Sequence, residues 1–468
     1  MAKRLLDQRW LWLAAAGAIV LAFLSTVVEI RAPGDWDDRP LGSIDDIEAL
    51  RDRDDLNVLF IVIDTLRAEH LGSYGYARDT SPVLDRTAAS GVRFARHLAQ
   101  SSWTKASMAS LWTGLYPART GITRFDQVIP DEARMPAEIL RDAGFQTVGL
   151  YRNGWVAPTF GFDQGFEVYK RPLPVPLPPG VRRENPTVSD AGSDEGVAAA
   201  AVEFLRLRGG DRWFLYLHLM DVHEYLYDEK SALFGLKYSD VYDNSIRWTD
   251  GVIEFLLGSL AELGYLDETL VVVSSDHGEA FGERGFEGHA RKVYREETEI
   301  PWLIFFPFRL QSGLVVETRT RNVDVWPTVL DLLGLEMHPT DGRSRLPEIL
   351  ASARGEAPPV DGDPAIAHLD QTWARAGRSP QPTVAVSDGT LRYVRVQQEN
   401  GVIEQLYDAS DDPRELRDRA GEDPDSRKRL AALADSYLEL QPAWGEAPKR
   451  EIGELELNHL RALGYAVP

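Results

Sequence analysis

The stretch Val58-Leu-Phe-Ile-Val-Ile63 decides the fold class of this chain of 468 residues. It is a continuous apolar run rich in β-branched residues, which is typical of a strand buried on both faces of a parallel sheet. Similar runs, which we predict to be further strands of the same sheet, lie at 146–150, 213–219, 270–273 and 300–306. Helical patterns lie among them at 80–90, 136–143, 196–207 and 240–263. This alternation predicts an α/β fold with a mostly parallel sheet covered by helices on both faces.

The pattern changes after about residue 340. Residues 390–398 and 402–407 are predicted to be strands of a small antiparallel unit, and residues 424–438 are predicted to form a helix packed against it. A Pro-rich stretch at 172–189 is predicted to be a surface loop. We therefore expect a main domain at 56–340 and a smaller α+β subdomain at 341–468.

Residues 1–30 form a separate predicted segment. Basic residues precede an apolar run at 11–28, which is just long enough to cross a bilayer as a helix. Acidic residues follow from Glu29 onward, so the positive-inside rule places the rest of the chain outside the cytoplasm. We interpret the segment as an uncleaved single-pass anchor in the cell membrane, with the domain facing the periplasm or the outside of the cell. A cleavable signal peptide is the alternative. The Pro- and Asp-rich residues 31–55 are predicted to be a polar linker.

Composition excludes some classes of function. The net charge of −22 argues against nucleic acid as a partner, because an acidic surface repels phosphate. The chain has no cysteine, which excludes disulfides and thiolate metal sites. Histidine, carboxylate and hydroxyl groups remain as possible metal ligands.

Polar side chains cluster at the predicted ends of three strands. Asp64 directly follows the first strand, His223 lies just beyond the strand at 213–219, and Asp276 and His277 follow the strand at 270–273. Ligand sites in open α/β sheets form at the carboxyl ends of strands, although any one such residue is more often a turn former or a cap. A hydroxyl, Thr104, stands where a short helix is predicted to begin. Together these groups predict a metal-activated hydroxyl nucleophile.

Several motifs resemble the sulfatase branch of the alkaline phosphatase superfamily, in the order in which that family carries them. They are Val62-Ile-Asp-Thr-Leu-Arg-Ala-Glu-His-Leu-Gly72, Leu115-Tyr-Pro117, Asp221-Val-His-Glu-Tyr225, Ser275-Asp-His-Gly-Glu279, Leu406-Tyr-Asp408 and the ending Leu460-Arg-Ala-Leu-Gly-Tyr465. The resemblance spans residue 56 to the C-terminus. It implies a three-layer α/β/α sandwich and an enzyme that cleaves sulfate or phosphate esters.

The chain departs from the sulfatase pattern at the nucleophile. Sulfatases carry Cys or Ser there, oxidised to formylglycine, whereas Thr104 falls at this position and cannot give an aldehyde. Ala106 stands in place of the family's Pro, Met108 in place of its Arg, and Thr65 in place of its second N-terminal Asp. These departures put the formylglycine mechanism in doubt.

The remaining set is Asp64, Thr104, Asp276 and His277. It is similar to the one-metal site of lipoteichoic acid synthases and phosphoethanolamine transferases, which act on phosphodiesters and phospholipid head groups. Two carboxylates, an alkoxide and an imidazole suit one Zn²⁺ or Mn²⁺ ion, with Ca²⁺ or Mg²⁺ as the alternative. We expect the metal-facing atoms of the four residues to lie within about 5 Å of one another.

Other residues are given secondary roles. His223 and His289 are candidates for protonating a leaving oxygen, by resemblance and by the ordinary pKa of histidine. Lys105 and Lys292 are candidates for binding a substrate anion. His218, inside an apolar strand, is predicted to be a hydrogen-bonded core histidine. For Thr104 a plain helix N-cap is the alternative.

The sequence as a whole predicts a membrane-anchored, metal-dependent hydrolase or transferase. It would act on a phosphate or sulfate ester, such as a lipid head group or an envelope glycan, through a covalent intermediate on Thr104. One alternative is hydrolysis of true sulfate esters, and the other is a binding protein that keeps the fold without turnover.

Overall fold

The computed structural model describes residues 36–467, apart from positions 175, 190, 191, 358, 360–362, 399 and 466. The anchor predicted at 1–30 therefore lies outside the described residues. Within the described ranges, no helix combines the length and the apolar character needed to cross a membrane.

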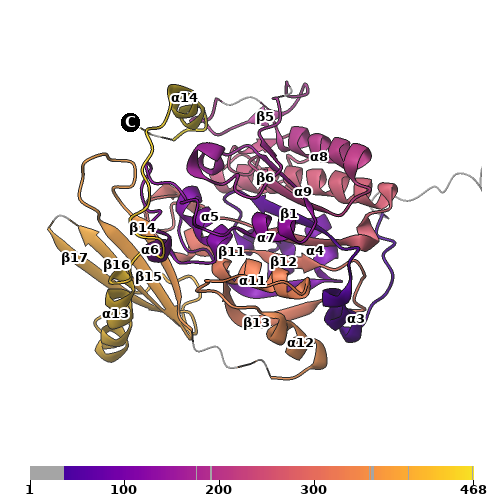
Figure 1. Cartoon of the computed structure of the whole chain (residues 1–468). Coiled ribbons are helices and arrows are strands. Elements are labelled where there is room, and N and C mark those ends of the chain that lie inside the picture. Colours follow the sequence, from indigo (N-terminus) through magenta and orange to yellow (C-terminus); the bar gives the residue numbers. More distant parts are fainter. Residues whose placement is uncertain are drawn as a thin grey trace, which may run out of the picture. The chain divides into compact units, whose positions relative to one another are not determined.

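A mixed, mostly parallel sheet of nine strands forms the centre of the fold (Figure 1). Strand β1 (Asn57–Ile63) pairs in parallel with β6 (Trp213–Leu219) on one side and β8 (Thr269–Ser274) on the other. The order is β11-β2-β12-β8-β1-β6-β3-β4, with β13 paired to β2. The other strands are β2 (Val92–Leu98), β3 (Gln146–Tyr151), β4 (Val168–Lys170), β11 (Glu299–Ile300), β12 (Trp302–Phe305) and β13 (Leu314–Arg321). The predicted strands are confirmed, and the fifth is divided at Pro301.

Helices cover both faces of the sheet, as predicted. Alternate residues of β1, such as Phe60, pack in one core with Trp112 of α5 and Trp326 of α11. Helices α5 (Thr104–Thr113), α7 (Pro136–Asp142) and α11 (Asn322–Leu332) contribute to this core. Helices α8 (Asp194–Arg208) and α9 (Tyr238–Leu263) lie on the other face (Figure 1), and α4 (Pro82–Ala88) packs against α9. The three-layer α/β/α sandwich is thus confirmed. Short elements are α6 (Pro117–Thr120), α10 (Arg295–Thr298), β5 (Arg182–Arg183), β7 (Leu226–Tyr227), β9 (Ala280–Phe281) and β10 (Glu287–Gly288).

A four-stranded antiparallel sheet forms the predicted C-terminal α+β subdomain. Its strands are β14 (Ala365–Asp370), β15 (Pro382–Asp388), β16 (Leu391–Gln398) and β17 (Gly401–Asp408). Helix α13 (Pro424–Leu438) packs on this sheet, with Leu430 and Tyr437 in the same core as Tyr393 (Figure 1).

The predicted polar linker at 31–55 is wrong from Arg39 onward. These residues belong to the same compact unit as the rest of the described chain. Helix α3 (Ile44–Ala49) begins there because Ser43 and Asp46 form a capping box. Ile47 and Leu50, one helical turn apart, are buried in the main core. The charged residues around them, Asp45, Asp46, Glu48 and Arg51, masked this short amphipathic helix in the sequence.

The predicted boundary at residue 341 separates parts that pack together. Leu346 and Ile349 of α12 (Leu346–Arg354) belong to the main core, as does Leu460 of α14 (Glu454–Ala462). The segments before and after the antiparallel sheet therefore pack on the main domain, and the chain's last described residues return to it.

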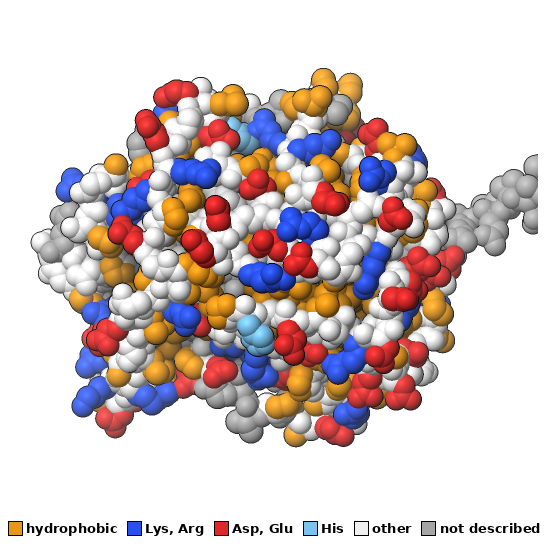
Figure 2. Space-filling model, viewed as in Figure 1, with side chains coloured by type: hydrophobic (Ala, Val, Ile, Leu, Met, Phe, Trp, Pro, Cys, Tyr) orange, Lys and Arg blue, Asp and Glu red, His pale blue; other side chains and the backbone are white. Residues whose placement is uncertain are grey.

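Charged side chains are mixed on the face drawn in Figure 2. Lys and Arg side chains alternate with Asp and Glu across the described residues there (Figure 2). Acidic side chains on this face are thus interspersed with basic ones rather than gathered in one field.

Candidate active site

Asp64 is the first residue after the central strand β1. It is fully buried, and its Oδ2 accepts hydrogen bonds from Asn153 Nδ2 at 2.6 Å and His218 Nε2 at 3.1 Å. Its Oδ1 is buried and has no hydrogen-bond partner among the described residues. One oxygen is thus held in place, and the other is left for a ligand.

Asp276 and His277 follow β8, the parallel neighbour of β1. Oδ1 of Asp276 accepts from the backbone N–H of His277 at 2.9 Å, whereas its buried Oδ2 has no hydrogen-bond partner in the described structure. His277 Nδ1 lies 3.0 Å from the carbonyl of Gly278. Because a carbonyl can only accept, Nδ1 carries the proton, and Nε2 presents its lone pair to the cluster.

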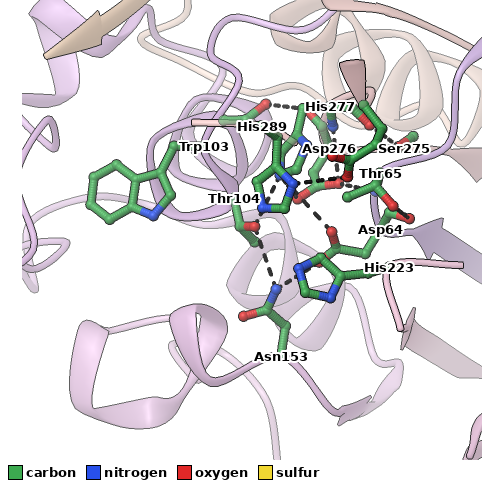
Figure 3. Close-up of polar contacts among 12 residues, drawn as sticks. Asp64, Thr65, Trp103, Thr104, Asn153, His223, Ser275, Asp276, His277 and His289 are labelled. Carbon is green, nitrogen blue, oxygen red and sulfur yellow. Dashed lines mark hydrogen bonds and ion pairs between the residues drawn. The ribbon is translucent and has the colours of Figure 1, made fainter. Parts of the chain in front are cut away.

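Thr104 is the first residue of α5, and its hydroxyl faces this cluster (Figure 3). Its Oγ1 lies 3.1 Å from His277 Nε2 and 3.4 Å from Asn153 Nδ2. The N-cap of the helix is Trp103, and no side chain caps this end. The structure therefore does not support the alternative that Thr104 serves only as an N-cap.

The cluster fits a divalent cation. One ligand atom each from Asp64, Asp276 and His277 lie within 4.8 Å of one another, near the spacing of ligands bound at about 2.0–2.3 Å to one ion. Two buried carboxylate oxygens point into this space without a hydrogen-bond partner among the described residues, which costs free energy unless a cation compensates them. Thr104 would be the fourth ligand of such an ion.

The two carboxylates differ in their pKa. Burial tends to raise the pKa of Asp64, but the hydrogen bond from His218 and the neighbouring imidazoles of His223 and His277 bring it below the ordinary value. Burial and the charge of Asp64 raise the pKa of Asp276. Without an ion the pair therefore favours a single negative charge, and a dication would favour two.

His223 and His289, the candidate proton donors, lie beside the cluster (Figure 3). Their rings are 5.1 Å apart, and the ring of His289 is 4.6 Å from that of His277. Burial lowers the pKa of His223 to about 4. Burial opposes protonation of His289 too, but Glu279 Oε2, 2.9 Å from its Nδ1, raises its pKa above the ordinary value.

The two candidate lysines are placed differently. Lys105 is fully buried; its ammonium donates to the carbonyl of Phe125 at 2.7 Å and lies 3.9 Å from the centre of the Phe160 ring. Burial lowers its pKa well below the ordinary value. It holds the adjoining loop and contacts no member of the metal cluster in the described structure. Lys292 is half-buried beside the site, where its carbonyl accepts from the hydroxyl of Ser102.

Sequence reasoning missed three residues that adjoin the cluster. Asn153 lies just beyond the carboxyl end of β3. The rule that ligand sites form at the carboxyl ends of strands, which found Asp64 and Asp276, could therefore have found it too. His218 is the core histidine that was predicted, but its partners are Tyr216 and Asp64, which places it directly behind the site. Tyr465 comes from the far end of the chain, and no local pattern marks it as a site residue.

Comparison with known proteins identifies the family. The sulfatase family model matches residues 56–335, and the chain belongs to this family. The chain is similar to arylsulfatase K of Xenopus laevis, with 31% identity over 193 residues that cover 40% of this chain and 35% of the relative. It is also similar to steryl-sulfatase of Rattus norvegicus, with 24% identity over 407 residues that cover 63% of this chain and 70% of the relative. The matched regions thus cover from about a third to just over two thirds of the length of these curated relatives.

Solved structures share the fold. Phosphonate monoester hydrolase of Agrobacterium radiobacter aligns with a TM-score of 0.66 and 21% identity, covering 82% of this chain and 95% of that one. A 2-O GAG sulfatase aligns with a TM-score of 0.65 and 20% identity, covering 82% and 92%. At these sequence identities, the similarity to the solved structures shows a shared fold only.

Proposed function

We propose that this protein is a metal-dependent ester hydrolase or transferase that acts on phosphate or sulfate esters through a covalent intermediate on Thr104. The observation that carries the proposal is the position of the Thr104 hydroxyl, 3.1 Å from His277 Nε2. It lies in a buried cluster where two carboxylate oxygens have no hydrogen-bond partner in the described part of the chain. Family membership supports the class, because the relatives include sulfatases and the structural neighbours include a phosphonate monoester hydrolase.

Asp64, Asp276, His277 and Thr104 would hold one divalent ion. Zn²⁺ or Mn²⁺ suits this mixed oxygen and nitrogen set best, with Ca²⁺ or Mg²⁺ as the alternative. When bound, the ion would lower the pKa of the alcohol and stabilise charge on the ester oxygens.

The chain's own groups account for the bond changes. Thr104 enters as the alkoxide, and its oxygen forms a bond to phosphorus or sulfur while the bond to the leaving oxygen breaks. The leaving oxygen takes the bonding pair and accepts a proton from His223 or His289. A water oxygen then attacks, one water proton returns to that histidine, and Thr104 leaves as the alkoxide. In a transferase, an acceptor alcohol replaces the water.

Phosphate esters are the preferred substrates in this proposal. Threonine cannot be oxidised to the aldehyde on which the sulfatase mechanism depends, and Met108, which replaces the family's arginine, is fully buried in the core. Direct hydrolysis of sulfate esters by Thr104 remains the alternative within the same class, and a binding protein without turnover is the alternative outside it.

Three chromogenic esters separate these possibilities. Purified protein would be stripped with a chelator, reloaded with Zn²⁺, Mn²⁺, Ca²⁺ or Mg²⁺, and assayed with bis(4-nitrophenyl) phosphate, 4-nitrophenyl phosphate and 4-nitrophenyl sulfate. We expect metal-dependent turnover of a phosphate ester, and phosphothreonine at Thr104 in acid-quenched samples by mass spectrometry. Turnover of the sulfate alone would select the sulfatase alternative. Metal binding without turnover of any ester would select the binding protein.

We also propose that the protein is anchored in the membrane by residues 1–30 and faces the periplasm or the outside of the cell. The basic flank before the apolar run at 11–28 supports this orientation. A reporter that is active only after export, fused after Thr340, should be active. Activity of a cytosol-only reporter at the same position would contradict the proposal.

A further inference from the structure

We infer that Tyr465, almost the last residue of the chain, is a positioning residue that orients His223 for proton transfer to the leaving oxygen. The inference rests on the proposed function, in which His223 is a candidate proton donor. Burial lowers the pKa of His223 to about 4 in the unliganded site, so His223 takes up its proton only when the anion of a bound ester lies beside it. We call residues 453–465 the C-terminal strap; the strap contains helix α14.

The end of α14 is shaped to deliver Tyr465. Gly464 adopts a left-handed conformation with φ of 89°, and the backbone N–H of Tyr465 donates to the carbonyl of Leu460 at 3.0 Å. This is the usual way in which a glycine ends a helix and reverses the chain. A side chain at Gly464 would place its Cβ 2.4 Å from Thr187 Oγ1, so the turn has no room for a larger residue. Leu460 and Leu463 anchor the strap in the main core.

The hydroxyl of Tyr465 meets two residues that face the nucleophile. It lies 3.2 Å from Asn153 Nδ2 and 3.4 Å from His223 Nε2. Asn153 in turn contacts Thr104 Oγ1 at 3.4 Å and Asp64 Oδ2 at 2.6 Å. A continuous chain of polar contacts thus joins the ring of His223 to the nucleophile through Tyr465. His223 Nδ1, the other ring nitrogen, is buried and has no hydrogen-bond partner in the described residues, so Tyr465 supplies the hydrogen-bond contact that holds this ring.

The strap also holds the backbone of His223 through a neighbouring loop. The N–H of Ser189 donates to the carbonyl of Ala462 at 2.7 Å, and Asn185 Nδ2, in the same loop, donates to the carbonyl of His223 at 2.9 Å. His223 is therefore fixed at its ring by the strap and at its backbone by a loop bonded to the strap. These two attachments point to a positioning role rather than to filling of space alone.

The role predicts a dependence on the leaving group. A poor leaving group must gain a proton as it departs, whereas a good one can leave as the anion. Tyr465→Phe keeps the ring, whose centroid lies 5.6 Å from that of Trp155, but removes the hydroxyl. The variant should therefore lose kcat/KM, which reports the steps up to departure of the leaving group, selectively on poor leaving groups.

The test compares 4-nitrophenyl and phenyl esters of the same acid, with metal-loaded, full-length protein. We expect Tyr465→Phe to lower kcat/KM by about tenfold or more for the phenyl ester, and by less than about threefold for the 4-nitrophenyl ester. Tyr437→Phe is the matched control. It removes a hydroxyl that accepts from the backbone N–H of Ala118 at 3.0 Å and lies 3.1 Å from His368 Nδ1, and the ratio of its kcat/KM values on the two esters should match the wild type.

Each result has a distinct meaning. Equal losses on both esters, or no loss, would overturn the positioning role while leaving the proposed function intact. If Tyr465→Phe does not fold, Asn185→Ala provides the second variant, because it frees the backbone of His223 without touching the cluster, and it should show the same selective loss. An inactive wild type on both esters would overturn both proposals.

Discussion

Two clusters of buried carboxylates in this molecule are compensated in opposite ways. Asp324, near the start of α11, lies between two arginines: Arg321 Nη2 is 2.8 Å from its Oδ1, and Arg345 Nη2 is 2.7 Å from its Oδ2. At the candidate active site, Asp64 and Asp276 are equally buried, but within the described residues the only ion-pair partner of Asp64 Oδ1 and Asp276 Oδ2 is the imidazole of His277.

The difference separates a structural charge from a functional one. Burial alone would raise the pKa of Asp324, but the two arginines lower it to about 2, so its charge is satisfied inside the fold. The pKa of Asp276 is instead raised. A site that binds a cation holds its buried carboxylates without full charge compensation while the cation is absent, which costs free energy. The cluster around Asp324 does not have this cost, because its arginines are always present. Three experiments test the comparison.

The largest effect should come from the nucleophile beside the uncompensated carboxylates. Thr104→Ala should lower kcat/KM on the best ester by about 10³-fold or more, because the covalent step loses its attacking oxygen. Thr104→Ser keeps a hydroxyl and should retain measurable turnover. Stability should change little, because the Thr104 side chain caps no helix.

The matched control lies at the other end of the same helix. Thr113→Ala removes a hydroxyl that donates to the carbonyl of Ala109 at 2.7 Å, and it should leave kcat/KM near the wild-type value. If folded Thr104→Ala protein were as active as wild type, a water would have to be the nucleophile, and the covalent intermediate would be excluded.

Replacing Asp by Asn should change the free energy of unfolding by different amounts in the two clusters. Asp324→Asn removes the carboxylate that the buried Arg321 and Arg345 share, although Arg345 keeps Glu348 as a partner at 3.0 Å. The variant should lower the free energy of unfolding by about 3–5 kcal/mol. Asp276→Asn in metal-free protein removes a repulsion with Asp64 and should change stability by less than about 1 kcal/mol. It should also abolish the stabilisation that added metal gives the wild type.

Urea unfolding with and without chelator measures both variants. Equal losses for the two metal-free proteins would show that the carboxylates of the site are as well compensated as Asp324, and would contradict the reading of this cluster as a cation site. Undiminished metal stabilisation in Asp276→Asn would remove Asp276 from the ligand set.

The smallest effect concerns pH. The folded pKa of Asp324, about 2, is below the ordinary value of 3.8, so its contribution of about 2 kcal/mol is present above pH 4 and is lost as the pH falls toward 2. The raised pKa of Asp276 has the opposite sign in metal-free protein: protonated Asp276 contributes stability that is lost as the pH rises. Urea midpoints at a series of pH values, for wild type and Asp324→Asn, measure the contribution of Asp324. If the urea midpoint of Asp324→Asn fell with decreasing pH as steeply as that of the wild type, the predicted contribution of Asp324 would be wrong.

The sequence determined the framework and part of the site. Continuous apolar runs predicted β1, β3, β6 and β8 because strands buried on both faces need apolar side chains at every position. The rule that ligands meet at the carboxyl ends of such strands then selected Asp64, Asp276 and His277, which the structure brings together. Strand β2, with the sequence Val-Arg-Phe-Ala-Arg-His-Leu, went unpredicted because its charged residues interrupt the apolar pattern toward the edge of the sheet.

Only the tertiary structure decided how the site is completed. Lys105 follows Thr104 in the sequence, yet successive side chains on a helix point in different directions, and its ammonium is held by a loop carbonyl rather than by the metal cluster. Tyr465 is 361 positions from Thr104 and reaches the site because a glycine turn ends α14 and a buried leucine anchors the strap. Local patterns report which face of an element is buried. They do not report which distant segment will pack there, because that depends on the packing of the whole chain.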